Sequence, residues 1–71
     1  MNKYLVVVEE TATGFSAYSP DLLGCAATGK TAKEVEQAMQ EAIELHLDGM
    51  REDGELVPEP HCYSTYCEVR T

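Results

Sequence analysis

The residues between Thr31 and Gly54 carry the pattern that most constrains the fold of this chain. Thr31 followed by Glu34 has the form of a capping box, in which the Thr31 hydroxyl and the Glu34 carboxylate each accept a backbone N–H at the start of a helix, Glu34 reaching back to the N–H of Thr31. Gly54 suits the left-handed position that ends a helix, and Pro58 and Pro60 prevent the helix from resuming. Between these signals, apolar residues recur at spacings of three and four: Val35, Ala38, Met39, Ala42, Ile43, Leu47 and Met50. The pattern predicts one amphipathic helix of about twenty residues.

Short strands are expected on both sides of this helix. Residues 3–9, 15–19 and 25–28 precede it, with a hairpin turn at 11–14, and residues 62–69 follow it with alternating polarity. The first segment is apolar on both faces, so we expect it to be an inner strand. The order is strand, strand, strand, helix, strand (β-β-β-α-β). This order predicts a two-layer α+β fold, a mostly antiparallel sheet under one long helix, as a single domain of residues 1–71.

The stretch GCAATGKT, residues 24–31, matches the nucleotide-binding pattern G-x-x-x-x-G-K-[ST]. A working loop of this type must leave a buried parallel strand and run into a helix. Here Pro20 and Asp21 interrupt the preceding residues, and several βαβ units would not fit in 71 residues. We therefore interpret the match as accidental and expect no cofactor.

The charge of the chain restricts its partners. Thirteen Asp and Glu residues against five Lys and Arg residues give a formal net charge of −8, which repels nucleic acid and anionic membranes and attracts basic proteins. The apolar run near the N-terminus is too short for a signal peptide or a membrane span, which favours the cytoplasm. So small a chain hides only part of its apolar surface, so we expect a homodimer or homotetramer.

Metal binding and catalysis have weak support in the sequence. Cys25, Cys62 and Cys67 are an odd number of cysteines and are expected to be thiols. His61 lies directly before Cys62, and Cys67 follows five residues later, so a zinc site has to be considered. On one strand, however, a spacing of five puts the sulfur atoms of Cys62 and Cys67 on opposite faces, which disfavours zinc. His46 lies near the apolar stripe of the helix, where packing at a helix–sheet or subunit contact is favoured over a catalytic or metal role.

A metal-dependent ribonuclease would need several carboxylates converging on its ions. Glu9 and Glu10 are neighbours on a strand and point to opposite faces, and Asp21 is the only other acid near a strand end in the first half. We therefore expect these acids to be solvated and the protein not to be an enzyme.

Residues 18–60 resemble the HicB family of antitoxins. The small domain of that family has a Pro-Asp-Leu-Pro-Gly-Cys turn, a Gly-x-Thr-x-x-Glu helix start, an alanine-rich amphipathic helix and a Gly-x-x-x-Pro exit. The matching residues here are Pro20, Asp21, Leu22, Gly24, Cys25, Gly29, Thr31, Glu34, Ala38, Ala42, Gly54 and Pro58. Leu23 replaces the usual proline, which predicts a less rigid turn. The chain also ends where many members continue into a DNA-binding domain, so operator binding is not expected.

The resemblance implies a partly degenerate ribonuclease-H-like fold that binds and neutralises a small HicA-type mRNA interferase, a basic ribonuclease that uses a histidine. An acidic protein can cover a basic RNA-binding groove by complementary potential. The candidate contact residues are Asp21 and Leu22 of the turn and Glu52, Asp53 and Glu55 of the helix exit. The helix face of Glu36, Glu41, Glu44 and Asp48 is an alternative surface, and either set can be merely solvated. The competing function is an orphan oligomeric scaffold or a small-ligand-sensing module.

Overall fold

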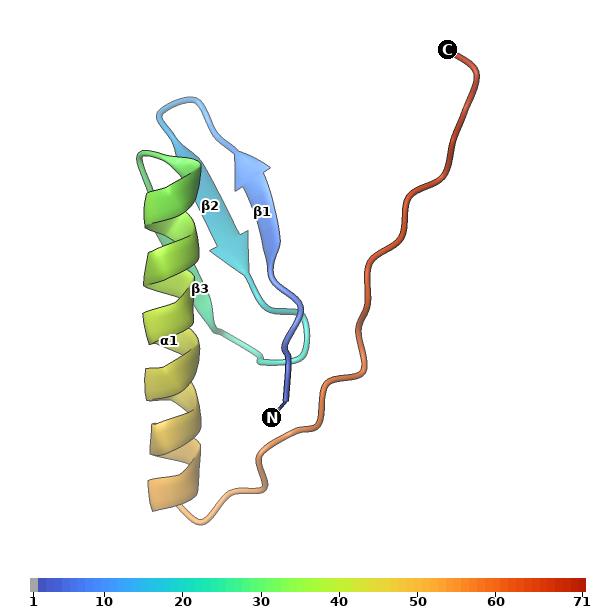
Figure 1. The fold of residues 1–71 in the computed structure, drawn as a ribbon. Helices are drawn as coiled ribbons and strands as arrows, with labels where there is room; N and C mark the ends of the chain where they lie inside the picture. Colours follow the sequence, from blue (N-terminus) through green and yellow to red (C-terminus); the bar gives the residue numbers. More distant parts are fainter. Residues whose placement is uncertain (1) are drawn as a thin grey trace.

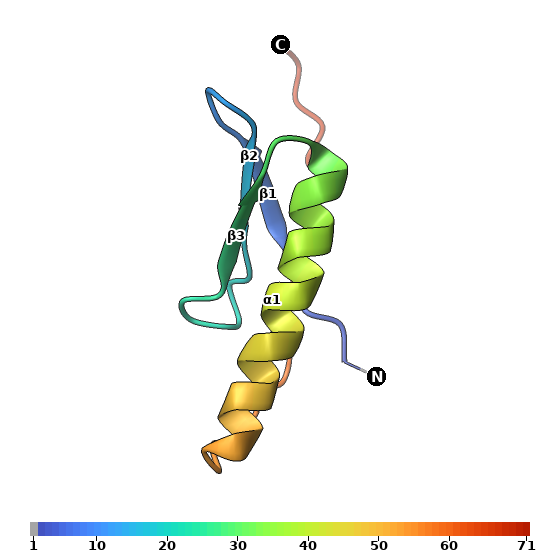
Figure 2. The same ribbon diagram turned by 90° about the vertical axis from the view of Figure 1, so that its left-hand side faces the viewer.

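The computed structural model of the chain describes residues 2–71, and these contain three β-strands followed by one helix. The strands are β1 (Val7–Glu10), β2 (Phe15–Tyr18) and β3 (Ala26–Gly29), and the helix is α1 (Ala32–Glu52). The strands are antiparallel in the order β1-β2-β3, and α1 lies across one face of the sheet (Figures 1 and 2). The predicted α+β class, with an antiparallel sheet and one long helix, is confirmed.

The strand register decides which side chains face the helix. Val8 is paired with Ala17, and Ala17 is paired with Ala27, so these three residues share one face of the sheet. Ala17 belongs to the buried core and Ala27 packs against it, which identifies this face as the one under α1. The neighbouring positions, such as Val7 and Tyr18, point to the other face. Figure 2 shows the helix on one side of the sheet only.

The core is small and lies between α1 and the sheet. Within the described residues 2–71, five hydrophobic residues are buried: Ala17, Leu22, Cys25, Val35 and Met39. Val35 and Met39 are one helical turn apart, which places both on the inner side of α1. Gly29 allows the layers to approach closely, because a Cβ atom at that position would lie 2.6 Å from the backbone nitrogen of Val35. The start of the helix is therefore pressed directly onto the end of β3.

The predicted helix start is confirmed with one difference in its hydrogen bonds. Thr31 is the N-cap residue, and its Oγ1 accepts a hydrogen bond from the Glu34 N–H at 3.1 Å. The Glu34 carboxylate, however, accepts from the N–H of Lys30 at 3.0 Å. The expectation that it would reach the N–H of Thr31 is wrong by one residue, because the carboxylate holds the N–H just before the N-cap.

The prediction that β1 is an inner strand and that residues 62–69 form a final strand is wrong for this chain. β1 is at the edge of the sheet, and residues 55–71 form an extended tail without a strand assignment (Figure 1). Alternating polarity describes the two faces of a segment, but a strand also needs a neighbouring edge for its backbone N–H and C=O groups. The tail meets no such edge, and its side chains from residue 61 onward are exposed.

Candidate partner-binding groove

Two consecutive turns form the loop between β2 and β3. The N–H of Leu22 donates to the carbonyl of Ser19 at 3.1 Å, and the N–H of Cys25 donates to the carbonyl of Leu22 at 3.0 Å. Pro20 occupies the second position of the first turn, where its fixed φ is favourable. Gly24 occupies the third position of the second turn with φ of 81°, a value that favours glycine. The consequence is that Leu22 points into the core and Leu23 points out.

Asp21 ties this loop to the tail. One oxygen of its carboxylate, Oδ2, accepts hydrogen bonds from the backbone N–H groups of His61 at 3.1 Å and Cys62 at 3.2 Å. Partial desolvation acts to raise the pKa of the Asp21 carboxyl, but the hydrogen bonds from Cys62 and His61 outweigh it, so the pKa lies below its usual value. In turn, the hydrogen bond to Asp21, with some desolvation, raises the pKa of the Cys62 thiol. The carboxylate is thus held ionised at neutral pH.

α1 ends in a regular C-terminal capping motif. Gly54 has φ of 73°, its N–H donates to the carbonyl of Arg51 at 3.1 Å, and the N–H of Glu55 donates to the carbonyl of Met50 at 2.9 Å. These are the two hydrogen bonds of a Schellman motif, with Asp53 as the C-cap. The motif turns the chain back toward the loop and fixes the backbone that carries Asp53 and Glu55.

A groove of about 580 Å³ lies between the loop and the C-terminal half of α1. Asp21, Asp53 and Glu55 bring three carboxylates to its lining, and the other lining residues are Leu22, Leu23, Leu45, His46, Gly49, Met50 and Pro58. The groove therefore combines an apolar surface with several acids and contains no lysine or arginine in its lining. Such a surface suits a basic partner that also carries apolar side chains.

The structure brings together four of the five residues that the sequence suggested for partner binding. Asp21, Leu22, Asp53 and Glu55 all line the groove, whereas Glu52, the last residue of α1, is exposed and lies outside the lining. Leu22 is only 1% exposed, so its contribution is to support the loop from below. Whether any of these residues contacts a partner stays a prediction.

Two residues of the groove were missed by the sequence reasoning. Leu23 is 96% exposed and Leu45 is 75% exposed, although both are large hydrophobic residues. Leu45 lies off the predicted apolar stripe of the helix, and Leu23 replaces a proline in the family turn. The sequence did contain a signal for Leu45, because it is an apolar residue outside the apolar stripe of the helix. For Leu23, only the geometry of the two turns reveals that the side chain points outward.

The acidic helix face is less concentrated. The Asp48 carboxylate forms an exposed ion pair with Arg51 at 3.1 Å, and Gln40 donates a hydrogen bond to Glu44 at 3.1 Å. Exposed pairs of this kind contribute little to stability. They do, however, partly neutralise the charge of Asp48 and engage the carboxylate of Glu44 in a hydrogen bond. The groove is therefore the more compact candidate surface for a basic partner.

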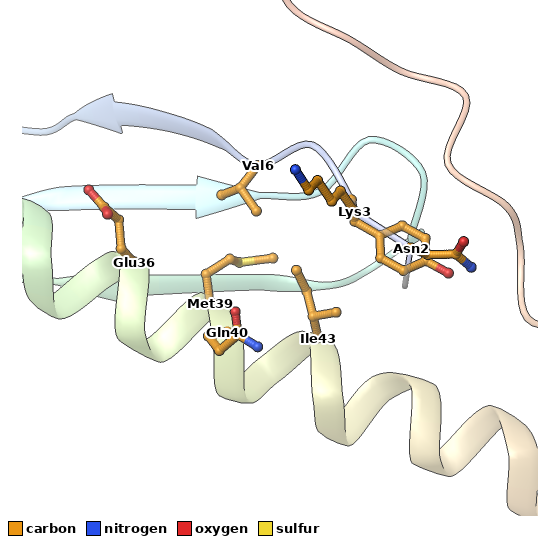
Figure 3. A pocket seen from close by; sticks show the side chains of 8 residues that line it. Asn2, Lys3, Val6, Glu36, Met39, Gln40 and Ile43 are labelled. Atoms are coloured by element: carbon orange, nitrogen blue, oxygen red, sulfur yellow. The ribbon is translucent and has the colours of Figure 1, made fainter.

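A second groove, of about 450 Å³, runs between α1 and the segment that leads into β1. Figure 3 shows Val6, Met39 and Ile43 facing one another across it, with Lys3 and Glu36 toward its ends. Tyr4 also lines it, and the Tyr4 hydroxyl donates a hydrogen bond to the carbonyl of Pro58 at 2.6 Å. This groove is open because α1 packs mainly against β3 and β2 and less against β1.

The other sequence candidates have simpler positions. Residues 26–29 of the stretch GCAATGKT form β3, so their backbone pairs with β2, and Thr31 caps α1. Among residues 2–71, no group of three or more His, Cys, Asp or Glu side chains is placed to hold a metal ion. Cys25 is buried, Cys62 and Cys67 are exposed, and all three are free thiols. His46 is half-buried in the lining of the groove.

Comparison with known proteins decides the family. Residues 4–69 match the family described as HicB-like antitoxin of bacterial toxin-antitoxin system. The chain belongs to this family. The match includes the loop with Asp21, the whole of α1 and most of the tail, so the resemblance noted in the sequence is confirmed. No helix of residues 2–71 is long and apolar enough to cross a membrane.

Two individual proteins are similar to most of the chain. It is 33% identical over 63 residues to an "Uncharacterized 14.9 kDa protein in rep-hol intergenic region" of Haemophilus phage HP1, covering 89% of this chain and 47% of the phage protein. It is 38% identical over 47 residues to a UPF0150 protein of Helicobacter pylori strain J99, covering 66% of this chain and 65% of that protein. The chain thus spans about half to two thirds of the length of these relatives.

A solved structure gives the same fold. A chain of a HicA3 and HicB3 toxin-antitoxin complex superposes with a TM-score of 0.70 and 30% sequence identity, covering 80% of this chain and 66% of that chain. This similarity supports both the architecture and the HicB-like assignment.

Proposed function

We propose that the protein is an antitoxin that binds a small basic toxin of the HicA type and neutralises it by covering its RNA-binding and catalytic surface. Membership of the HicB-like antitoxin family and the similarity to a chain of a HicA3 and HicB3 complex support this proposal. The observation that carries it is the groove, which places Asp21, Asp53 and Glu55 around the exposed side chains of Leu23 and Leu45.

The charges of the groove act mainly on the rate of binding. A chain with a net charge of −8 attracts a cationic protein over a Debye length of about 10 Å at 0.1 M ionic strength. The exposed Leu23 and Leu45 side chains then hold the complex through apolar contacts. These contacts do not depend on charge, so salt weakens the formed complex less than it slows association. The antitoxin acts by occlusion and without catalysis of its own.

The position of each acid favours the groove over other parts of the surface. Asp21 is fixed by the loop and by two hydrogen bonds to the tail, and Asp53 is the C-cap of α1. Glu55 follows the positive-φ glycine that reverses the chain. Side chains on such defined backbone positions lose less conformational freedom when they bind than side chains on a mobile segment.

The test is stopped-flow binding of a small basic HicA-type protein across a series of salt concentrations. Asp53→Lys with Glu55→Lys reverses two groove acids and is expected to slow association about tenfold or more at low salt. Glu41→Lys with Glu44→Lys is the matched control, since it makes the same change of charge on the outer face of α1, where a smaller effect is expected.

A second measurement tests neutralisation itself. RNA cleavage by the toxin is followed with increasing amounts of the antitoxin, and Leu23→Ser with Leu45→Ser is expected to raise the concentration needed for inhibition. If no HicA-type protein from the same genome binds the chain or is inhibited by it, the proposal is wrong. If both charge variants behave alike and salt has no effect, the groove is not the contact surface.

A further inference from the structure

We infer that the start of the tail and an arginine side chain of the basic partner compete for the carboxylate of Asp21, so that binding in the groove releases residues 61 and 62. The inference rests on the proposed function and deepens it, because it concerns how the same groove is regulated. Three observations carry it: the hydrogen bonds that Asp21 already accepts, the charges and apolar side chains around it, and the second attachment of the tail at Pro58.

Asp21 already binds hydrogen-bond donors from a distant part of the chain. The backbone N–H groups of His61 and Cys62, 40 and 41 positions further along the sequence, donate to it at 3.1 and 3.2 Å. Both donors use the same oxygen, Oδ2, and neither uses Oδ1. Hydrogen bonds from backbone N–H groups to a carboxylate stabilise its ionised form. The structure thus shows the Asp21 carboxylate in a bound state, with the start of the tail as its ligand.

The shape of a guanidinium group explains why an arginine displaces the tail. Arginine pairs with a carboxylate through two parallel N–H···O hydrogen bonds, one to each oxygen. On Asp21 this arrangement needs Oδ2, which the N–H groups of His61 and Cys62 occupy. A lysine ammonium group is a point charge without such a fork, so it can use Oδ1 alone and leave the tail in place. The competition is therefore specific to arginine.

The surroundings of Asp21 favour the arginine over the tail. Asp53 and Glu55 add two carboxylates to the groove, its lining contains no lysine or arginine, and the C-terminal end of α1 carries the negative end of the helix dipole. The exposed side chains of Leu23 and Leu45 can pack against the methylene groups of an arginine. A guanidinium group is attracted by all three carboxylates, whereas a neutral backbone N–H group carries no net charge for the other two to attract.

Release of the tail from Asp21 leaves no buried group unsatisfied. His61 and Cys62 are exposed, so water replaces the carboxylate as the acceptor for their N–H groups. From residue 61 onward the tail has no strand assignment and its side chains are exposed, so no apolar packing is lost when it moves. The Asp21 carboxylate exchanges two neutral donors for a charged one, and the freed donors are solvated.

Release is expected to stop at Pro58. The Tyr4 hydroxyl donates a hydrogen bond to the carbonyl of Pro58 at 2.6 Å, and Pro58 also lines the groove. This contact involves none of the groove acids, so an arginine on Asp21 leaves it unchanged. The beginning of the tail thus stays in place as one wall of the groove, and only the residues that follow Pro58 become free.

Alkylation of Cys62 measures the release. The hydrogen bond to Asp21 raises the pKa of the Cys62 thiol, so loss of the contact increases the fraction of thiolate at pH 8. When a small basic HicA-type protein from the same genome is added to the full chain, alkylation of Cys62 is expected to become severalfold faster, and the amides of His61 and Cys62 are expected to lose protection from exchange. Cys67 in the same sample is the control, with an unchanged rate. An unchanged or slower rate at Cys62 in the bound protein would overturn the inference and leave the proposed function standing.

Replacement of the arginines of the HicA-type protein by lysine, one at a time, tests the fork geometry. One of these substitutions is expected to retain binding while Cys62 returns to its slow alkylation, because an ammonium group leaves Oδ2 of Asp21 to the tail. If every variant that binds still releases the tail, arginine is not the competitor and the inference is wrong.

Competition also acts in the opposite direction, since the coupling between two binding events is reciprocal. His61→Pro with Cys62→Pro removes both N–H donors and keeps Asp21, and it is expected to bind the HicA-type protein severalfold more tightly. His61→Ala with Cys62→Ala is the matched control, because it keeps both N–H groups, and its affinity is expected to equal that of the unmodified chain. Equal affinities for the two variants would contradict the competition. If no HicA-type protein binds any of these chains, the proposed function and this inference are both wrong.

Discussion

Residues 2–54 and residues 55–71 show how differently two parts of one short chain can be stabilised. In the first part, ladder and helix hydrogen bonds satisfy the backbone, and Leu22, Val35 and Met39 are almost fully buried. In the second part, the tail is attached at its base by Tyr4 and Asp21, and its side chains from residue 61 onward are exposed. Both parts contain large apolar residues. The difference is that only the first part has a neighbouring surface on which to bury them.

This difference also separates two kinds of surface. The first part builds the groove between the loop and α1 from defined backbone positions. The tail presents exposed apolar side chains, such as Tyr63 and Tyr66, on an extended segment. A rigid groove favours recognition of a partner with fixed geometry, whereas an extended segment gains its structure when it pairs. The following predictions test how independent the two parts are.

The largest expected effect comes from the core. Met39→Ala removes a side chain that is 1% exposed and is expected to lower the free energy of unfolding by about 2–5 kcal/mol. Leu56→Ala removes a side chain that is 93% exposed at the start of the tail, and a change within about 0.5 kcal/mol is expected. Urea unfolding followed by circular dichroism measures both. Equal destabilisation by the two substitutions would show that the tail is part of the same cooperative unit.

A pair of glycines tests the close approach of α1 to the sheet. Gly29→Ala puts a Cβ atom 2.6 Å from the nitrogen of Val35, so the layers must separate, and a destabilisation of about 1–3 kcal/mol is expected. Gly49→Ala meets no atom within 4 Å inside α1, and a stabilisation of up to about 1 kcal/mol is expected. Opposite signs in thermal unfolding support the close packing. A stabilising Gly29→Ala would contradict it.

The smallest effect concerns the attachment of the tail. Asp21→Asn removes the carboxylate that raises the pKa of the Cys62 thiol, so alkylation of Cys62 at pH 8 is expected to become severalfold faster. Cys67, followed by mass spectrometry in the same sample, is the internal control. The overall free energy of unfolding is expected to change little, because the contact lies outside the core. An unchanged rate for Cys62 would show that Asp21 does not hold the tail in solution.

The same contact gives a pH dependence with a defined sign. The pKa of Asp21 is lowered in the folded chain, so its contribution is fully present above its ordinary value of 3.8 and is lost as the pH falls through the lowered value. Slower amide exchange at His61 and Cys62 than in unstructured peptides at the same pH is therefore expected near neutral pH, and this protection is expected to be lost in acid. Asp21→Asn should lose the protection already at neutral pH.

Several features followed from the sequence because they depend on local chemistry. The apolar spacing from Val35 onward and the cap at Thr31 predicted α1, and Gly54 predicted its end, because these signals act within one or two helical turns. The two strands that form the first hairpin, β1 and β2, were also predicted. The ordered turn, helix start and helix exit were enough to suggest the HicB-like family, and the charge of −8 was enough to favour a basic partner.

Other features depended on contacts between distant segments, and only the tertiary structure decided them. Local alternation predicted a strand at residues 62–69, yet whether a strand forms depends on a free edge that no local pattern contains. The groove joins Asp21 to Asp53 across 32 positions of sequence, and the exposure of Leu23 follows from a double turn around a positive-φ glycine. Sequence determines the preferences of each segment, because propensity and polarity are local. The tertiary structure decides which segments meet, because burial and pairing need two surfaces at once.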